Sequence, residues 1–511
     1  MIKKCLLSFL IIIFLVLAYK NPFNERSLVP NLEPYPDSIF YSYSPWNLIK
    51  GNGFGMNLDN IDIRNIVPPS YGIYLLPFLA VFNDIRAFYF ANIFLGIASI
   101  VFFFFITEKI FKNKVTSFIL GTILVTSYYF YSLPQFLMAE NMALAVFLIV
   151  FWIMLQPVSL KNIIIFTMLN GIFLLIKLSN VPIFASFCLL YFFKVLNEKN
   201  QIKLINFILV SVFIYGLSLG EIYLSGILRG REGFAGMVGF SPSYFKTNFN
   251  YYLDTLLGSN GRFIWMSEKF VTIDLMVLSL IGVGIGIIKK QKILLIKLAI
   301  LLISLLIFMG FFYYPDTRYI YLAYPLILIP IGFILNSFGS KKVLGVFLLV
   351  FAIGDFGLMS TKTTFEARII TLKKQVGLNF RHAEQPWNYL AVQNFNNYFS
   401  KNAGKKYLAT FLPVYYVSYF SNGNYHYLPI VKSQEFPEYI AKMCPSGVDK
   451  CYQDVLSKGG EIYLSNYYLS NNLTEWGKEL DKIKTKYKLT LVNEGCLGTC
   501  NIYKLENIKS L

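Results

Sequence analysis

The chain has 511 residues, of which 56% are hydrophobic and only 14% are charged, with a mean hydropathy of +0.54. This balance lies well to the apolar side of soluble proteins and indicates a membrane protein. The formal net charge of +18 does not indicate a nucleic-acid partner, because Lys and Arg lie mainly in short loops and form no basic stripe interleaved with aromatic residues. With only two histidines, a His-rich catalytic metal site is not expected.

The first apolar segment, residues 5–19, follows a short basic start. It has the composition of a signal peptide or of a first membrane helix, and the lack of a small-residue cleavage site favours a retained helix. Ten further apolar segments are predicted to cross a hydrocarbon core of about 30 Å. They are 86–107, 115–131, 137–155, 162–176, 180–194, 203–226, 271–288, 292–314, 317–336 and 341–360, which makes eleven spans.

The distribution of lysines predicts the orientation of these spans, because Lys and Arg near span ends stay on the cytoplasmic side. One set of connections is basic throughout: Lys3, Lys4, Lys109, Lys112, Lys114, Lys161, Lys194, Lys199, Lys203, Lys289, Lys290, Lys292, Lys341 and Lys342. The other set includes two long loops of mixed charge, 20–85 and 227–270. We therefore expect a multi-pass protein of the cell membrane with its amino terminus inside, and with both long loops and everything after residue 360 outside.

The segment 361–511 has the character of a soluble domain, because apolar runs shorten and turn signals appear. Residues 384–399 have the pattern of an amphipathic helix. Short strands are predicted at 407–411, 425–430, 461–464 and 489–492, with helical stretches near 433–443 and 473–487. The predicted architecture is thus a polytopic α-helical domain over 1–360 followed by an extracytoplasmic α/β domain.

The cysteines agree with this orientation. Four of the six, Cys444, Cys451, Cys496 and Cys500, lie in the predicted outer domain, where disulfides persist. Local pairs are the simplest arrangement, although three pairings are possible from sequence alone. A four-thiolate zinc site is the alternative, but the spacings match no common zinc pattern.

Ionisable residues gather at the predicted outer ends of the spans. A charge at the centre of a span costs roughly 2.5–3.5 kcal/mol, so their depth is informative. Each one alone is explained as an interfacial residue that reaches water; together they predict a polar chamber under the two long loops. They are Asp84, Arg86, Glu140, Lys177, Glu221, Asp274, Asp316, Arg318 and Asp355.

Several motifs in this part of the chain resemble those of a known superfamily. The first long loop contains Pro36-Asp37-Ser38, then Asn47 to Phe54 with Gly51 and Gly53, then Pro68-Pro69-Ser70-Tyr71 leading into an apolar helix. Met138-Ala139-Glu140, Leu175-Ile176-Lys177-Leu178 and Arg318-Tyr319 with Tyr324-Pro325 follow in order. This series resembles GT-C superfamily glycosyltransferases, particularly the protein O-mannosyltransferase and lipid A aminoarabinose transferase branch. The match is incomplete, because Ser38 stands where the family often has a second acidic residue.

The resemblance implies an inverting transfer of a sugar from a polyprenyl-phosphate donor to an acceptor hydroxyl at the outer face. It implies Asp37 as the catalytic base. For the substrates it implies Arg318 and then Lys177 as ligands of the lipid phosphate, Glu140 as a residue that orients the acceptor or an arginine, and Tyr71 as a further substrate contact. Arg229, with Arg231, is a weaker candidate for the phosphate, since a solvated loop explains both residues.

Other readings of these residues stay open. Asp37 is also explained as a solvated loop carboxylate, Glu140 as a charge favoured at a helix N-terminus, and Arg318 as an interfacial anchor beside Asp316. Asp59 and Asp62 are weak evidence for a metal, and we expect no cofactor and no essential metal. The acceptor is open among glycan, lipid and protein, with membrane lipid as the surroundings.

Two functions from other classes fit some of these features. A multi-pass transporter also has buried charges, but such proteins normally show two similar halves around a midplane site, and no such repeat is evident. A non-catalytic membrane scaffold with an outer binding domain predicts that Asp37 is dispensable.

The lysine pattern generates a test of topology. Single cysteines placed at Asn52 and Ser433 should react with a membrane-impermeant thiol reagent in intact cells, whereas a cysteine at Lys112 should react only after lysis. Labelling of position 112 in intact cells would reverse the predicted orientation.

Overall fold

The computed structural model describes residues 2–18, 37–58, 61–63, 67–84, 87–224, 241–257, 271, 273–312, 315–337, 394, 397–399, 406–410, 426–429, 444–465, 483–495 and 501–507. The chain divides into two compact units. The first unit comprises residues 1–28, 67–227 and 237–383, and the second comprises residues 29–66, 228–236 and 384–511. The second unit therefore includes part of each long loop and the predicted outer domain from residue 384 onward.

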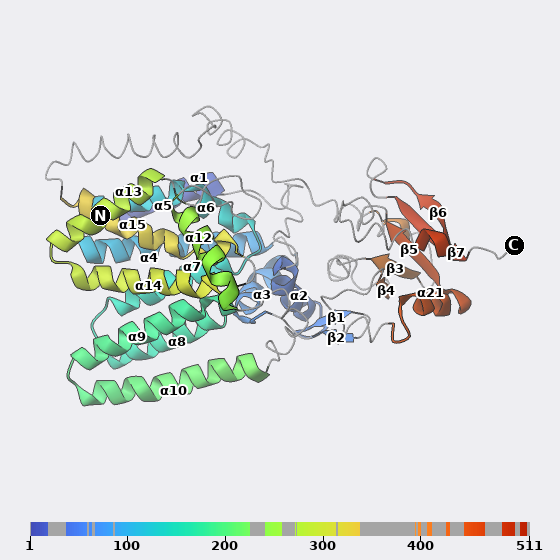
Figure 1. Ribbon diagram of the computed structural model, residues 1–511, viewed down its shortest axis with the longest axis horizontal. Helices are drawn as coiled ribbons and strands as arrows, with labels where there is room; N and C mark the ends of the chain where they lie inside the picture. Colours follow the sequence, from blue (N-terminus) through green and yellow to red (C-terminus); the bar gives the residue numbers. More distant parts are fainter. Residues whose placement is uncertain are drawn as a thin grey trace, which may run out of the picture. The chain divides into compact units, whose positions relative to one another are not determined.

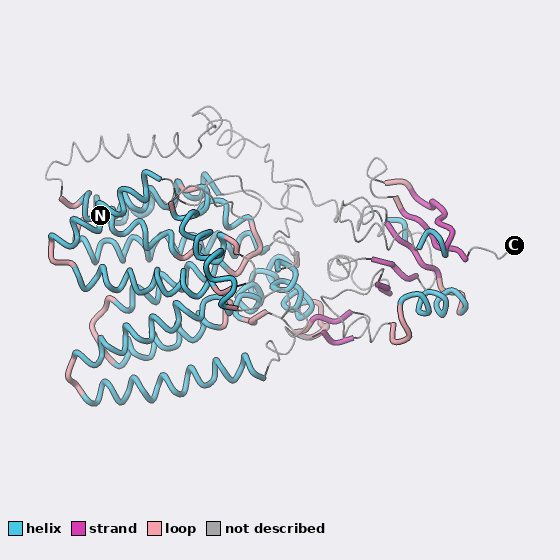
Figure 2. Tube along the Cα trace, in the orientation of Figure 1, coloured by secondary structure: helices cyan, strands magenta, loops and turns pink. Residues whose placement is uncertain are grey.

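The described part of the first unit is helical (Figures 1 and 2). In lipid, only a helix or a closed barrel satisfies every backbone polar group, so long apolar segments form helices. The α-helices are α1 (Ile2–Ala18), α3 (Ser70–Phe82), α4 (Phe88–Phe111), α5 (Lys114–Thr126), α6 (Tyr128–Ser132), α7 (Glu140–Met154), α8 (Leu160–Leu174), α9 (Val181–Asn197), α10 (Gln201–Leu224), α12 (Phe245–Leu256), α13 (Ile273–Ile288), α14 (Lys292–Gly310) and α15 (Ala323–Leu335). Short 3-10 helices are η3 (Leu133–Gln135), η4 (Leu178–Asn180), η5 (Pro242–Tyr244) and η6 (Thr317–Ile320).

The first ten predicted spans each coincide with helix in the structure, and the last, 341–360, lies outside the described residues. Two of them are interrupted. The segment 115–131 is divided at Ser127, whose backbone is extended, and the segment 317–336 begins as η6 before α15. By length and composition, α4, α10, α14 and the helical segment Leu178–Asn197 are able to cross a membrane, and most of the other apolar helices are shorter.

Glycine allows α13 and α15 to pack closely. On α13, a Cβ added at Gly282 would clash with the carbonyl oxygen of Pro330 on α15, whereas a Cβ added at Gly284 would meet nothing within 4 Å. Small residues at such crossings let helix backbones approach each other, which is how membrane helices gain packing energy.

We expect Gly282→Ala to destabilise the protein by about 1–3 kcal/mol, because backbone atoms must move to admit the methyl group. Gly284→Ala is the matched control in the same helix; it should be neutral or stabilising by up to about 1 kcal/mol, since alanine favours helix. Thermal unfolding in detergent measures both. Equal midpoints for the two variants would contradict the close α13–α15 contact.

The second unit contains a five-stranded mixed sheet with the order β4-β3-β5-β7-β6. β3 (Lys406–Thr410) is parallel to β4 (His426–Pro429) and to β5 (Glu461–Ser465). β7 (Ile502–Asn507) is antiparallel to β5 and to β6 (Tyr487–Asn493). The buried residues of this sheet include Leu428, Ile462, Leu464, Ile502 and Leu505. This unit also contains α2 (Asp37–Ile49) and a hairpin of β1 (Met56–Leu58) and β2 (Ile61–Ile63).

The four predicted strands overlap β3, β4, β5 and β6. β7 and α21 (Val448–Ser457) were not predicted from the sequence. β7 gives a weak strand signal because its two fully buried residues, Ile502 and Leu505, are three positions apart and do not alternate. Most of the predicted helices at 384–399, 433–443 and 473–487 lies outside the described residues.

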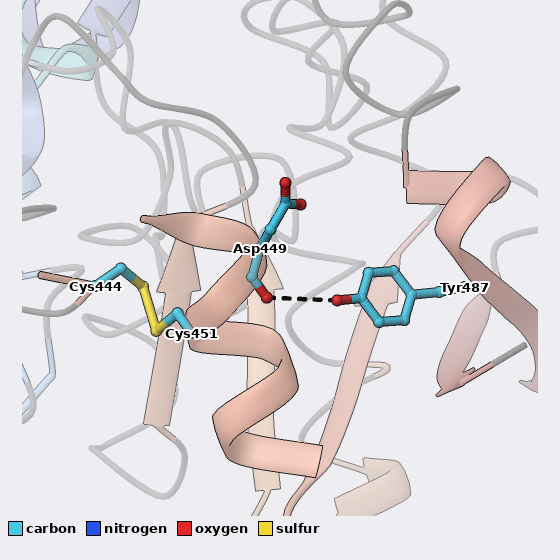
Figure 3. Close-up of a disulfide and its surroundings, with 4 residues drawn as sticks. All are labelled: Cys444, Asp449, Cys451 and Tyr487. Atoms are coloured by element: carbon cyan, nitrogen blue, oxygen red, sulfur yellow. Dashed lines mark hydrogen bonds between the residues drawn. A yellow bond between two sulfur atoms is a disulfide. The ribbon is translucent and has the colours of Figure 1, made fainter. Parts of the chain in front are cut away.

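A disulfide joins Cys444 to Cys451, with 5.3 Å between the Cα atoms (Figure 3). It ties the turn before α21 to the first turns of that helix. Gly447 lies inside this loop with a φ of +94°, a conformation that favours glycine. The Tyr487 hydroxyl on β6 donates to the carbonyl oxygen of Asp449, which joins α21 to the sheet (Figure 3). Cys496 and Cys500 lie outside the described residues.

Trypsin cuts after Lys442, Lys450 and Lys458 and therefore separates the two bonded cysteines. A non-reducing digest should yield peptides 443–450 and 451–458 joined as one species, which separates into its two parts on reduction. Mass spectrometry measures this directly. Free thiols at both Cys444 and Cys451 in protein purified without reductant would contradict the disulfide.

Candidate active site

Glu140 is the first residue of α7, where the helix macrodipole favours a negative charge. Its backbone position is secured by the next residue. The Asn141 amide donates to the carbonyl oxygens of Leu133, Phe136 and Met138 at 3.1–3.2 Å. Glu140 itself is buried, with 5% of its surface exposed, so its carboxylate requires a partner.

That partner is Lys177, which lies just beyond the end of α8 and forms an ion pair with Glu140. The two side chains are 13% and 6% exposed, respectively. The turn that carries Lys177 is held by Asn180, whose amide donates to the carbonyl oxygen of Phe173 at 2.9 Å. Loss of one partner of such a buried pair is costly because the other charge is left without compensation.

A second ion pair lies in the turn between α14 and α15. Oδ1 of Asp316 accepts a hydrogen bond from the backbone N–H of Arg318 at 2.9 Å and thereby caps η6. Its other oxygen is 3.2 Å from Nε of Arg318, and both side chains are nearly buried. Burial raises the pKa of the Asp316 carboxyl, while the positive charges of Arg318 and Lys177 oppose that rise.

α12 supports this turn with two tyrosines. The backbone N–H of Asp316 donates to the Tyr252 hydroxyl at 3.3 Å. The hydroxyls of Tyr251 and Thr317 are 3.1 Å apart, within hydrogen-bonding distance. Neither tyrosine was predicted from the sequence as part of the site; the available signal was an aromatic pair in a short amphipathic segment of the second long loop.

Tyr319 links the two ion pairs. Nζ of Lys177 lies 5.0 Å from the centre of the Tyr319 ring, and Cζ of Arg318 lies 5.1 Å from it. We call Glu140, Lys177, Asp316 and Arg318 the four-charge cluster. The structure thus brings together three of the predicted site residues, Glu140, Lys177 and Arg318, with Asp316 as the fourth member.

Tyr71 has an anchoring contact. It is fully buried on α3, and its hydroxyl donates to Oδ1 of Asn92 on α4 at 2.7 Å. The Asn92 amide in turn donates to the carbonyl oxygen of Phe136 at 2.9 Å. α3 also contacts the end of α8, because the Ser70 N–H donates to the Leu175 carbonyl. Through these bonds, Tyr71 fixes α3 to the segment that precedes Glu140.

Other predicted site residues are less fully described. Asp37 is the first residue of α2, and its side chain is outside the described part. Arg229 lies outside the described residues, as do Arg231 and Asp59. Within the described ranges, no three His, Cys, Asp or Glu side chains are close enough together to hold a metal ion.

An apolar groove of about 680 Å³ lies between α8 and α10. Ile164 and Met168 of α8 and Leu175, which follows the last residue of α8, line it on one side, and Leu209, Phe213 and Leu217 line it from α10. Leu175 is two residues before Lys177 along the chain. The groove therefore reaches the end of α8, close in sequence to Lys177 of the four-charge cluster.

No protein-family model matches the chain, and no curated protein matches it in sequence. The fold does match solved structures. ArnT from Cupriavidus metallidurans, a lipid A aminoarabinose transferase, aligns in its apo state with a TM-score of 0.60 and 11% identity over 94% of this chain and 95% of that one. The same enzyme bound to undecaprenyl phosphate aligns with a TM-score of 0.61 and 10% identity over 99% and 98%.

The oligosaccharyltransferase of Archaeoglobus fulgidus, solved with Zn and sulfate, aligns with a TM-score of 0.52 and 11% identity over 98% of this chain and 73% of that one. Both enzymes are GT-C superfamily glycosyltransferases. At this level of identity the match concerns the fold alone, and that fold agrees with the one implied by the resemblance of the sequence motifs. The chain has a GT-C-type fold.

Proposed function

We propose that this protein is an inverting membrane glycosyltransferase that moves a sugar from a polyprenyl-phosphate donor to an acceptor hydroxyl at the outer face of the cell membrane. The observation that carries the proposal is the four-charge cluster, because it places two cations around one aromatic ring at helix ends in a GT-C-type fold. The acceptor is a glycan, a lipid or a protein. The outer-face orientation, the transfer of a sugar and the class of acceptor are all parts of this proposal.

The cluster suits a lipid phosphate. As the glycosidic bond breaks, negative charge grows on the departing phosphate, and cations held in place beforehand stabilise it without reorganisation. Arg318 provides a guanidinium suited to two parallel hydrogen bonds, and Lys177 provides a point charge. Both cations are already largely withdrawn from water by folding, so the phosphate does not have to remove their hydration when it binds.

The apolar groove supports a lipid donor. It is lined by aliphatic and aromatic side chains, and it ends near Lys177. A polyprenyl chain in this groove would bring its phosphate to the cationic end. One of the similar ArnT structures is bound to undecaprenyl phosphate, which agrees with a donor of this class.

Asp37 is the proposed catalytic base. A hydroxyl is a poor nucleophile, and a carboxylate beside it removes its proton as the new bond forms. The sugar then develops oxocarbenium character between the incoming oxygen and the departing phosphate. Attack opposite the leaving phosphate inverts the anomeric carbon. Asp37 has this role through the motif in which it stands; no metal takes part in the proposed reaction.

The proposal is tested by comparing three variants for donor binding and for transfer of a labelled sugar in liposomes. Asp37→Asn should lower turnover by about 10²- to 10⁴-fold, the range for general-base catalysis, with donor affinity nearly unchanged. Arg318→Ala should weaken donor binding by about tenfold to a hundredfold, because a charged hydrogen bond to the phosphate is lost in the ground state.

Asp316→Asn is the matched control, since it breaks the same ion pair but leaves the guanidinium in place. It should keep or strengthen donor binding. If Asp316→Asn and Arg318→Ala weaken binding equally, Arg318 acts only through its ion pair. Full turnover in correctly inserted Asp37→Asn removes that residue from the mechanism and favours the transporter or scaffold alternative.

A further inference from the structure

Tyr319 is the one described residue whose ring is in contact with both cations of the four-charge cluster. The negative face of an aromatic ring attracts a cation within about 6 Å of its centre, and both Lys177 and Arg318 meet this distance. They come from α8 and from the α14–α15 turn, 141 positions apart in the chain. The ring therefore connects two parts of the site that share no backbone element.

The contacts of the Tyr319 ring counteract the repulsion between Lys177 and Arg318. Two cations close together repel each other, and each tends to turn toward water. Glu140 forms an ion pair with Lys177, and Asp316 forms one with Arg318. The Asp316 carboxylate also attracts Lys177 electrostatically. The Tyr319 ring attracts both, and it is itself supported by Phe312, whose ring centre is 6.2 Å away.

The hydroxyl of Tyr319 makes a smaller contribution to this geometry. It accepts a hydrogen bond from one terminal nitrogen of Arg318 at 3.3 Å, which is long for a hydrogen bond to a guanidinium. The ring contacts involve two cations, whereas this bond involves one. Removal of the hydroxyl alone should therefore change the site less than removal of the ring.

We propose that Tyr319 is a positioning residue whose ring holds Lys177 and Arg318 together, so that one phosphate group of the donor contacts both cations. This inference rests on the proposed function for the identity of the ligand. It assigns to the ring a role that the ion pairs leave open, namely to set the separation of the two cations before the donor arrives.

The test compares Tyr319→Phe, which keeps the ring, with Tyr319→Leu, which removes it. The probe is a polyprenyl phosphate without sugar, titrated into the full-length protein in nanodiscs. Tyr319→Phe should bind within about twofold of the parent, whereas Tyr319→Leu should bind about tenfold more weakly, equivalent to the loss of cation–π contacts to two partly buried cations. Equal weakening in both variants would place the effect in the hydroxyl and overturn the proposal.

A second readout needs no donor. Lys177 should react faster with an amine-acetylating reagent in Tyr319→Leu than in the parent or in Tyr319→Phe, because the ammonium is released to water. Lys203 on α10, whose side chain is 31% exposed and paired with Glu198, is the internal control and should react at one rate in all three proteins. Unchanged labelling of Lys177 in Tyr319→Leu would show that the ring does not hold this lysine and would overturn the proposal.

The two readouts separate this inference from the proposed function. A parent protein that binds no polyprenyl phosphate overturns the proposed function and the phosphate part of the inference. The labelling of Lys177 then still decides whether the ring positions the cation. If the parent binds the probe and Tyr319→Leu binds it equally well, the positioning role is refuted while the proposed function stands.

Discussion

The meeting of the start of α7, the end of α8 and the α14–α15 turn depends on the compensation of buried charges. Two carboxylates and two cations lie there with side chains between 6% and 14% exposed. The effective penalty for an unpaired buried ion is several kcal/mol, so the start of α7, the end of α8 and the α14–α15 turn must meet for these residues to be tolerated. The tyrosines of α12 and the Tyr71–Asn92 bond then fix the neighbouring segments around the same place.

The same compensation has a consequence for function. A cluster in which each cation already has a carboxylate is close to neutral, so it does not hold small anions from bulk water by net charge alone. A donor that also buries a long apolar chain has additional binding energy, and the groove between α8 and α10 offers a surface for it. This combination favours a lipid-linked phosphate over a soluble one. A scaffold does not require partly buried cations, and their burial costs free energy.

Much of the helical unit was predictable because long apolar runs leave the backbone few alternatives in lipid. The charged positions Glu140, Lys177 and Arg318 were also identifiable, since polar residues stand out in apolar surroundings. Their pairing was not. Glu140 and Lys177 are separated by a whole helical hairpin, and hydropathy does not state which helix ends meet. The anchoring role of Tyr71 was hidden for the same reason, because its partner Asn92 is on another helix.

The sheet was harder to predict than the helices. Parallel pairing of β3 with β4 and β5 depends on segments far apart in sequence, and β7 has buried residues that do not alternate. The disulfide that closes the turn before α21 joins Cys444 to its nearest cysteine along the chain, Cys451. It corresponds to the local pairing, the simplest of the three that the sequence left open.

Glycosyl transfer is tested most directly by mass spectrometry of cell-envelope fractions from cells with and without this protein. Transfer by the protein predicts an envelope component whose mass is greater by one sugar residue only when the protein is present. This result identifies the transferred group without any assumption about the acceptor. Envelope fractions with identical masses, from cells in which the protein is inserted and a polyprenyl-phosphate sugar is present, would contradict glycosyl transfer as its function.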